Sequence, residues 1–305
     1  MPEVTNKPAG KVHWANKGDK RLFLWEKSST AQVPARGTIL FVHGSSEAST
    51  PVFDLQVPGR AGSSAMDWFA ARGFDTWCVD MEGYGRSTKD RSHNSDIATG
   101  AADLEAAANY IRSQRGGIPL LVYGISSGAL RAALFAQNRP ELVKRLALDA
   151  FVYTGAGSPT LAERSKRLPQ FLASHTRPLD RAFVHSIFER DHPGAADPQT
   201  VDRYADAVLA LDNDLPTGTY ADMCAKLPLV DPQRISMPTL IMRGQYDGIA
   251  SFDDLLAFFA QLPSPDKQLS VMPGIAHSSF QEKNHLIAYE ILFAFFSRPE
   301  PAYTG

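Results

Sequence analysis

The sequence predicts an α/β fold, in which helices cover both faces of a mostly parallel central sheet and a helical insertion is added to it. Three observations carry this prediction. Short apolar runs recur along the 305 residues, separated by segments with apolar residues at three- and four-residue spacing. Such strand–helix alternation builds parallel sheets. An interval from Thr154 to Met237 has no convincing strand, and a Gly-x-Ser-x-Gly motif lies between a strand and a helix.

The first predicted element is a β-hairpin, because apolar and polar residues alternate in Val12–Trp14 and Leu22–Trp25 on either side of Gly18-Asp19. Later strands are predicted wherever a short apolar run is bounded by turn residues. They are Thr38–Val42, Asp75–Asp80, Pro119–Tyr123, Leu146–Tyr153, Thr239–Met242 and Gln268–Met272. Helical spacing between the early strands covers Ala65–Ala71, Leu104–Ile111 and Leu130–Leu134.

The interval from Thr154 to Met237 breaks this alternation. Pro and Gly residues divide it into four predicted helices, Leu161–Ser174, Pro178–Glu189, Pro198–Leu211 and Gly218–Lys226. Four helices without a strand predict an insertion that lies over the sheet. The chain is therefore expected to form a core from residues 1–153 and 238–305, with residues 154–237 inserted between the two parts.

Composition excludes several classes of protein. The 44% apolar content excludes a disordered chain, and the net charge of −2 argues against a nucleic-acid or polybasic membrane surface. The longest apolar runs are far shorter than the roughly 20 residues that span a bilayer, and the first fifteen residues lack the order of a signal peptide. Cys78 and Cys224 are far apart and suit a reducing compartment. We expect a cytoplasmic protein.

The strongest chemical signal is the motif from Gly124 to Gly128, which follows an apolar strand and precedes a helical pattern. A strand that turns sharply into a helix strains the middle residue, and only glycines fit two positions away on either side. Ser126 is therefore the predicted nucleophile, and the Ser127 amide lies at a helix N-terminus, which favours an anion. Ser127 is the alternative serine but lacks this glycine frame. A strand–helix turn without chemistry is the other interpretation.

A serine hydroxyl needs a base, and the base needs an acceptor. Of eight histidines, His277 is the best candidate, because it lies in a Pro/Gly loop directly after the last predicted strand. Asp247 follows the strand before it and is the predicted acceptor. Asp149 and Glu82 are alternatives, since each also lies at or just after a predicted strand. The order Ser, Asp, His is the one that accompanies this motif on an α/β sheet.

The sequence resembles the α/β-hydrolase superfamily, and is most similar to its cap-bearing esterase and lyase-type branch. The resemblance covers Thr38–Ser46, Val79–Ser87, Leu120–Leu130, Pro238–Gly248 and Val271–His277. It implies that the backbone N–H groups of Ser45 and Ser127 form an oxyanion hole and that His43 is structural. It also makes Thr154–Met237 a helical cap inserted after the sixth strand of the common core. Glu82 stands where the family commonly has arginine, and we expect it at the surface.

These observations predict a serine hydrolase that cleaves a small or medium, partly hydrophobic carboxylic ester or lactone in a predominantly apolar pocket. No motif for a cofactor or metal is present, so we expect a small-molecule substrate, no cofactor, no metal and no nucleic acid. A homodimer is possible. A carbon–carbon bond hydrolase or a cofactor-free lyase could use the same triad, and a non-catalytic receptor could retain it.

Overall fold

The computed structural model describes residues 8–31 and 35–303. Of the first fifteen residues, in which we expect no signal peptide, residues 1–7 therefore lie outside the described part. The described residues form an eight-stranded sheet of order β1-β2-β4-β3-β5-β6-β9-β10. β1 and β2 form the expected antiparallel hairpin, β2 is antiparallel to β4, and the other neighbours are parallel. The strands are β1 (Lys11–Lys17), β2 (Lys20–Lys27), β3 (Gly37–Val42), β4 (Phe74–Val79), β5 (Leu120–Ile125), β6 (Val143–Asp149), β9 (Thr239–Gly244) and β10 (Lys267–Met272).

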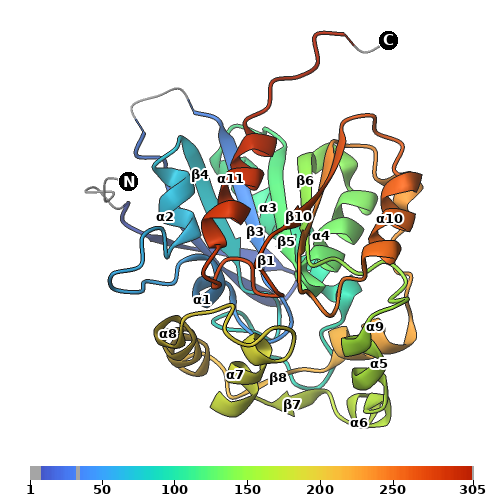
Figure 1. Cartoon of the computed structure of the whole chain (residues 1–305). Coiled ribbons are helices and arrows are strands. Elements are labelled where there is room, and N and C mark those ends of the chain that lie inside the picture. The colour runs from blue at the N-terminus through green and yellow to red at the C-terminus, as the bar shows by residue number, and fades with distance from the viewer. Residues whose placement is uncertain (1–7, 32–34, 304–305) are drawn as a thin grey trace.

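Helices cover both faces of this sheet, as the sequence predicts (Figure 1). α2 and α11 lie side by side on one face, where Trp68 and Phe69 of α2 contact Tyr289 of α11. α3 and α4 lie on the other face, and α3 begins where the Asp96 carboxylate accepts the Thr99 amide. The core helices are α1 (Ser49–Phe53), α2 (Ala65–Ala70), α3 (Ile97–Gln114), α4 (Ser127–Asn138), α10 (Phe252–Gln261) and α11 (His285–Phe296), with 3-10 turns at Pro140–Leu142 and Pro232–Arg234.

One predicted strand is displaced along the chain. The expected Leu146–Tyr153 strand is β6, which begins at Val143 and ends at Asp149. Ala150 adopts a φ of 50°, a left-handed conformation that no strand accommodates, so the ladder ends before it. This shift places Asp149 at the carboxyl end of the strand, beside the end of β5.

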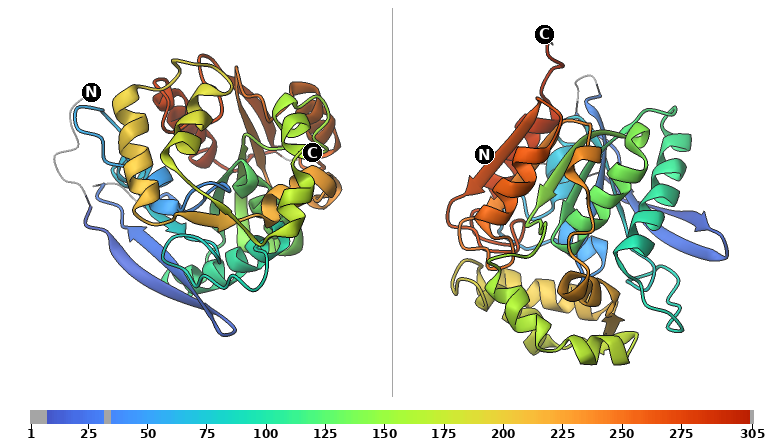
Figure 2. Two further views of the ribbon diagram at one scale, coloured as in Figure 1. Left: turned by 90° about the horizontal axis from the view of Figure 1, so that it is seen from below. Right: turned by 90° about the vertical axis from the view of Figure 1, so that its right-hand side faces the viewer.

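Residues 154–237 gather beyond the carboxyl ends of the parallel strands (Figure 1), and a view from below shows them spread across that end of the sheet (Figure 2). They form α5 (Pro159–Ser165), α6 (Leu168–Ala173), α7 (Arg181–Glu189), α8 (Pro198–Leu209) and α9 (Gly218–Ala225). The predicted helix Leu161–Ser174 is divided into α5 and α6, because Pro169 has no amide to donate to the carbonyl four residues earlier, and so stands in the first turn of a new helix.

The prediction that this interval has no strand is wrong. β7 (Thr176–Pro178) and β8 (Asp214–Pro216) pair antiparallel within it. Each is three residues long, too short for an alternating apolar pattern. The interval is fixed to the core at its first residues, where the Asp254 carboxylate of α10 accepts the amides of Tyr153, Thr154 and Gly155.

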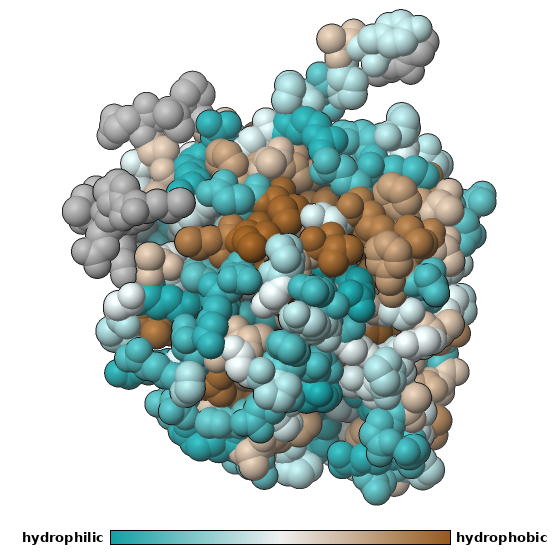
Figure 3. All heavy atoms as spheres, viewed as in Figure 1, coloured by the Kyte–Doolittle hydropathy of each residue, from teal (hydrophilic) through white to brown (hydrophobic). Residues whose placement is uncertain are grey.

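The surface carries one conspicuous apolar band, which crosses the face seen in Figure 1 over α11, β10 and α10 (Figure 3). Val271 of β10 and Phe252 and Leu256 of α10 are exposed there, at 44%, 43% and 39%. β10 is also the last strand of the sheet. Among the described residues, no helix combines the length and apolar character that a membrane-spanning segment requires.

Candidate active site

The predicted nucleophile lies at a strained turn between β5 and α4. Ser126 has φ 58° and ψ −127°, a combination that residues with a side chain rarely adopt. The turn is held from both sides, because the Ser126 amide donates to the Asp149 carbonyl oxygen at 2.9 Å and the Ser126 carbonyl accepts the Ala129 amide at 3.0 Å. Strain of this kind persists only where the surroundings fix it, and it is common at catalytic residues.

The two flanking glycines are required by close backbone contacts. A Cβ atom at Gly124 would lie 2.7 Å from the carbonyl carbon of Gly128, and a Cβ at Gly128 would lie 2.8 Å from the carbonyl carbon of His43. Both distances are shorter than real Cβ contacts, and the atoms met are backbone, which cannot move aside cheaply. The glycine spacing that singles out Ser126 in the sequence therefore has a direct steric cause here.

His277 and Asp247 meet although 30 residues separate them. Asp247 follows β9, His277 follows the neighbouring strand β10, and His277 Nδ1 lies 3.1 Å from Asp247 Oδ1. The same oxygen accepts the Ile249 amide at 2.8 Å, which fixes the carboxylate. With Nδ1 donating to Asp247, Nε2 of His277 is left to accept a proton.

The pair is electrostatically coupled. Burial alone would lower the pKa of His277, but the charge of Asp247 and its hydrogen bond outweigh burial and raise the pKa above its ordinary 6.5. Burial alone would raise the pKa of Asp247, but the His277 charge and the hydrogen bonds from His277 and the backbone hold it below its ordinary value. Asp247 therefore stabilises the protonated imidazole.

Ser126 and His277 line one cavity, together with Ser45. No hydrogen bond joins the Ser126 hydroxyl to His277 in the described chain, and in ligand-free sites such contacts are often long. The backbone N–H groups of Ser45 and Ser127 have no partner within the described residues, and Ser127 is the first residue of α4. Two free amides beside the serine are what an oxyanion hole requires.

Neither alternative acid, Asp149 or Glu82, is hydrogen-bonded to His277 in the described structure. The Asp149 carboxylate accepts the Tyr123 hydroxyl at 2.7 Å, and burial, aided by the charge of Asp247, raises its pKa to about 7. No hydrogen bond in the described structure joins it to His277. Glu82 is not at the surface as expected. Its side chain is 3% exposed, and its burial is compensated by Lys17, whose Nζ lies 2.7 Å away, while His93 Nε2 lies at 2.9 Å.

His43 has a structural environment, as the resemblance implies. Its Nδ1 donates to the Gly44 carbonyl at 2.7 Å, and its Nε2 accepts the Met81 amide at 3.1 Å. Burial and the nearby charge of Arg131 lower its pKa to about 3. His43 is therefore neutral and ties the turn after β3 to the turn after β4.

The cavity is small, about 40 Å³, and polar side chains dominate its wall. The expectation of a predominantly apolar pocket is therefore wrong, because residues 154–237 turn charged and phenolic groups toward the serine. The polar lining is Ser45, Ser46, Glu47, Ser126, Arg164, Arg190, Tyr204, Tyr220, His277, Ser278 and Gln281, and the apolar lining is Val52, Ile125, Ile187 and Ile249.

Glu47 is a site residue that the sequence did not single out. It is buried beside the Tyr204 hydroxyl and the Gly44 amide, and burial raises its pKa although His277 and Arg177 oppose the rise. The feature of the sequence that points to Glu47 as a site residue is its position, four residues after His43 in the loop that follows β3. Tyr204 and Tyr220 also line the cavity, and their rings pack against Phe188 and Phe171 within residues 154–237.

Asp191, Asp247 and His277 are the described residues whose ligand atoms come close enough to share a cation, within 4.8 Å of one another. Their existing contacts already use these atoms. Asp247 and His277 are hydrogen-bonded to each other, and Asp191 forms a bidentate ion pair with Arg190 at 2.9 and 3.0 Å. The group is electrostatically satisfied as it stands.

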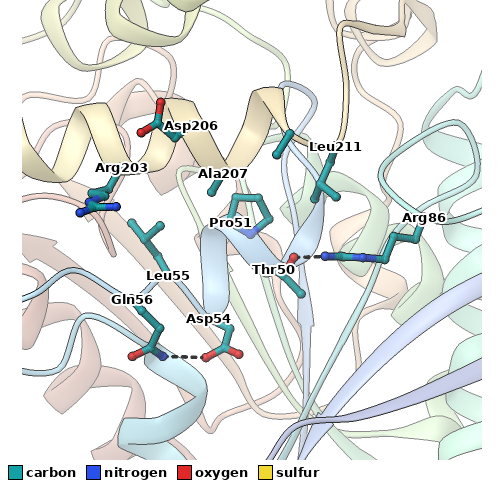
Figure 4. A pocket seen from close by; sticks show the side chains of 11 residues that line it. Thr50, Pro51, Asp54, Leu55, Gln56, Arg86, Arg203, Asp206, Ala207 and Leu211 are labelled. Carbon is teal, nitrogen blue, oxygen red and sulfur yellow. Dashed lines mark hydrogen bonds between the residues drawn. The ribbon is translucent and has the colours of Figure 1, made fainter.

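A second and larger hollow, of about 440 Å³, lies between α1 and α8. Figure 4 shows Arg203 and Ala207 of α8 on one side and Pro51 of α1 on the other, with Arg86 hydrogen-bonded to Thr50 at 3.1 Å. Its lining contains no histidine and no strained serine. The chemistry described above belongs to the smaller cavity.

Comparison with known proteins agrees with this architecture. A family model described as serine aminopeptidase, S33, matches residues 33–284. A monoacylglycerol lipase from Mycolicibacterium smegmatis is 23% identical over 258 residues, which cover 83% of this chain and 85% of that protein.

Two solved structures share the fold at low identity. An esterase from Exiguobacterium antarcticum superposes with a TM-score of 0.69 at 16% identity, over 93% of this chain and 99% of the other. A soluble variant of monoglyceride lipase from Saccharomyces cerevisiae gives a TM-score of 0.68 at 19% identity, over 97% and 96%. The chain belongs to the serine aminopeptidase S33 family of the α/β-hydrolase superfamily, and it is an esterase- or lipase-like hydrolase.

Proposed function

We propose that this protein cleaves a small or medium carboxylic ester through a Ser126–His277–Asp247 triad and an acyl-enzyme. The observation that carries the proposal is the site where parallel strands end. There the strained Ser126 lines one cavity with Ser45 and with an imidazole bonded to Asp247, and the free amide of Ser127 follows the serine at the start of α4. Each component performs a recognised part of acyl transfer.

The proposed reaction proceeds in two halves. Ser126 Oγ attacks the ester carbonyl while His277 Nε2 takes its proton, and Asp247 stabilises the resulting imidazolium. The carbonyl oxygen becomes an oxyanion that accepts the Ser45 and Ser127 amides, each worth roughly 2.7–4 kcal/mol in comparable sites. His277 then protonates the departing alcohol. Water attacks the acyl-enzyme by the same route and regenerates Ser126.

Replacing Ser126 with Ala tests the proposal. We expect hydrolysis of a p-nitrophenyl ester to fall to background, and labelling by a fluorophosphonate probe to disappear, while the melting temperature changes little. Pre-steady-state hydrolysis by the unmodified protein should show a burst of one p-nitrophenol per active site, provided deacylation is the slower half. Retention of more than a few per cent of activity in the Ser126→Ala protein would overturn the assignment of the nucleophile. Labelling of Ser126 without hydrolysis of any ester would favour a lyase.

Residues 154–237 are proposed to act as a cap. A cavity of about 40 Å³ holds only a few water molecules, so an ester must displace part of this segment or enter as it moves. Loop and cap movements of this kind exclude water and position the substrate. The segment supplies Arg164, Arg190, Tyr204 and Tyr220 to the cavity, so it also determines which esters fit.

We further propose that the protein acts in the cytoplasm on a small molecule, without a cofactor or nucleic-acid partner.

A homodimer would use the apolar band over β10 and α10, where Val271, Phe252 and Leu256 are exposed at the open edge of the sheet. Sedimentation of the unmodified protein and of Val271→Lys tests this. A monomer at all concentrations would exclude the dimer.

A further inference from the structure

Three arginines of residues 154–237 converge on one side of the cavity, around the ring of Tyr220. The guanidinium carbon of Arg164 lies 4.0 Å from the ring centroid, and that of Arg177 lies 4.3 Å from it. Arg190 lines the cavity with Arg164 and Tyr220. We call Arg164, Arg177 and Arg190 the arginine cluster.

Two of the three guanidinium groups have no carboxylate partner. In the described part of the chain, Arg164 forms neither an ion pair nor a side-chain hydrogen bond, although it is half-buried. Arg177 is 8% exposed and donates only to the Ser45 carbonyl and the Ser46 hydroxyl, both at 2.9 Å, which leaves its buried Nε without a partner. Arg190 alone is neutralised, by Asp191.

Unpaired guanidinium groups are costly to remove from water. The local excess of positive charge is also felt by Tyr220. Burial would raise its pKa, but the charges of Arg177 and Arg164, the Ser46 hydrogen bond and Arg190 lower it to about 7. The charge of Arg177 also acts on the Glu47 carboxyl in the same cavity, but no carboxylate among the described residues forms an ion pair with Arg164. A bound anion would complete the site.

We propose that Arg164 and Arg190 of the arginine cluster bind a carboxylate of the substrate, so that the ester hydrolysed is one that carries a free carboxylate group. This inference rests on the proposed function and narrows its substrate class. Guanidinium groups suit a carboxylate because their planar donors match its two oxygens. Arg164 and Arg190 line the same small cavity as Ser126, within reach of one short substrate. Arg177 holds the loop that carries the Ser45 amide, and so positions that amide rather than the ester.

The test compares esters that differ only by a carboxylate in place of a methyl group. Ethyl hydrogen succinate is paired with ethyl butanoate, and 4-acetoxybutanoate with butyl acetate, so that the charge is placed on the acyl or on the alcohol side. We expect kcat/KM for the charged member of at least one pair to exceed that of its neutral partner by about tenfold or more, as a charge-assisted hydrogen bond provides. Equal rates on both members would overturn the inference but leave the proposed function standing.

Variants identify the residue responsible. Arg164→Gln should reduce the charged-to-neutral ratio by about tenfold, and Arg164→Lys should restore part of it, since it keeps the charge but loses the planar donors. Arg203→Gln is the matched control, because it removes the same charge from α8 at the outer hollow shown in Figure 4. Its ratio should stay within about twofold of the unmodified protein. If Arg164→Gln lowers both members of a pair equally, the cluster only holds the cap and the inference fails.

Binding without turnover separates this inference from the proposed reaction. Calorimetric titration of the Ser126→Ala protein with ethyl hydrogen succinate and with 4-acetoxybutanoate should show binding of at least one of them, which the additional change Arg164→Gln weakens about tenfold. Absence of binding would overturn the carboxylate site. Binding to a protein that hydrolyses none of the four esters would retain the site and overturn the proposed reaction.

Discussion

Replacing Asp247 with Asn should move the pKa of His277 across its ordinary value. In the unmodified protein, the Asp247 charge and hydrogen bond raise that pKa above 6.5 against the effect of burial. The asparagine side chain would keep an oxygen for the Ile249 amide but lose the charge. Burial and Arg190, which both lower the pKa of His277, would then be opposed by Asp191 and by the nearby acidic groups Glu47, Asp149 and Glu282. Because burial is the largest of these influences, we expect the pKa to fall below 6.5.

The same change should slow the reaction. An imidazolium that forms during attack would no longer face a carboxylate, and Nδ1 would no longer be held as the donor. The corresponding replacement in the well-studied serine protease triad lowers kcat about 10⁴-fold, which is roughly 5.4 kcal/mol at 1.36 kcal/mol per factor of ten. The 3.1 Å contact and the full burial of Asp247 place this site in the same regime.

The assay is kcat/KM for a neutral ester between about pH 5 and pH 9. A general base must be neutral, so the rate rises as pH passes through the pKa of His277 in the free enzyme. The midpoint should lie above 6.5 for the unmodified protein and below 6.5 for Asp247→Asn, with a much lower plateau. A midpoint that stays above 6.5 in the variant would refute the electrostatic reasoning.

Two other carboxyl groups supply the controls. Asp149→Asn removes a buried carboxyl that is bonded to Tyr123, and should cost less than about tenfold in kcat/KM. Asp191→Asn removes a charge near His277 that has no hydrogen bond to it, and should lower the midpoint slightly. A larger loss from Asp149→Asn than from Asp247→Asn would transfer the role of acceptor to Asp149.

Two further predictions concern stability. Gly128→Ala should lower the free energy of unfolding by roughly 1–3 kcal/mol and also reduce activity, since its Cβ would press on the His43 carbonyl. Gly116 is the control, because a Cβ there meets open space although φ is 73°. Gly116→Ala should lower the free energy of unfolding by about 1 kcal/mol and leave activity unchanged. Lys27→Ala should lower the free energy of unfolding, measured in urea, by about 3–5 kcal/mol, because it leaves the carboxylates of Asp54 and Asp67 without their cationic partner. Lys166→Ala breaks only the exposed pair with Glu163 and should change stability by less than about 1 kcal/mol; equal losses from the two lysines would contradict this account.

The strands of the core could be predicted because burial on both faces leaves a continuous apolar run in the sequence. The runs before Ser126, Asp247 and His277 each end at a turn, and parallel strands end at one edge, so the three residues were expected to converge. The boundaries were less predictable. β6 ends at Asp149 because Ala150 adopts a left-handed conformation, which the presence of an alanine in the sequence does not predict.

Glu82 shows why burial of a charged residue is hard to predict. A lone glutamate in a loop is normally exposed, and its sequence neighbours give no reason for burial. Its partners are Lys17 of β1 and His93 of the loop before α3. Only the folded chain brings these segments together.

The substrate is harder to predict than the reaction for a related physical reason. The catalytic groups follow strand ends, and strand ends are fixed by the sheet. The specificity groups lie on short helices of residues 154–237, where the cavity-facing side depends on how the segment is folded and anchored. Arg164 is one of several arginines there, and nothing in its sequence context separates it from Arg167, three residues later and exposed. Its selection depends on the packing of α5 against α9, which brings it over Tyr220. The proposed preference for a charged substrate therefore depends on tertiary contacts that no local pattern encodes.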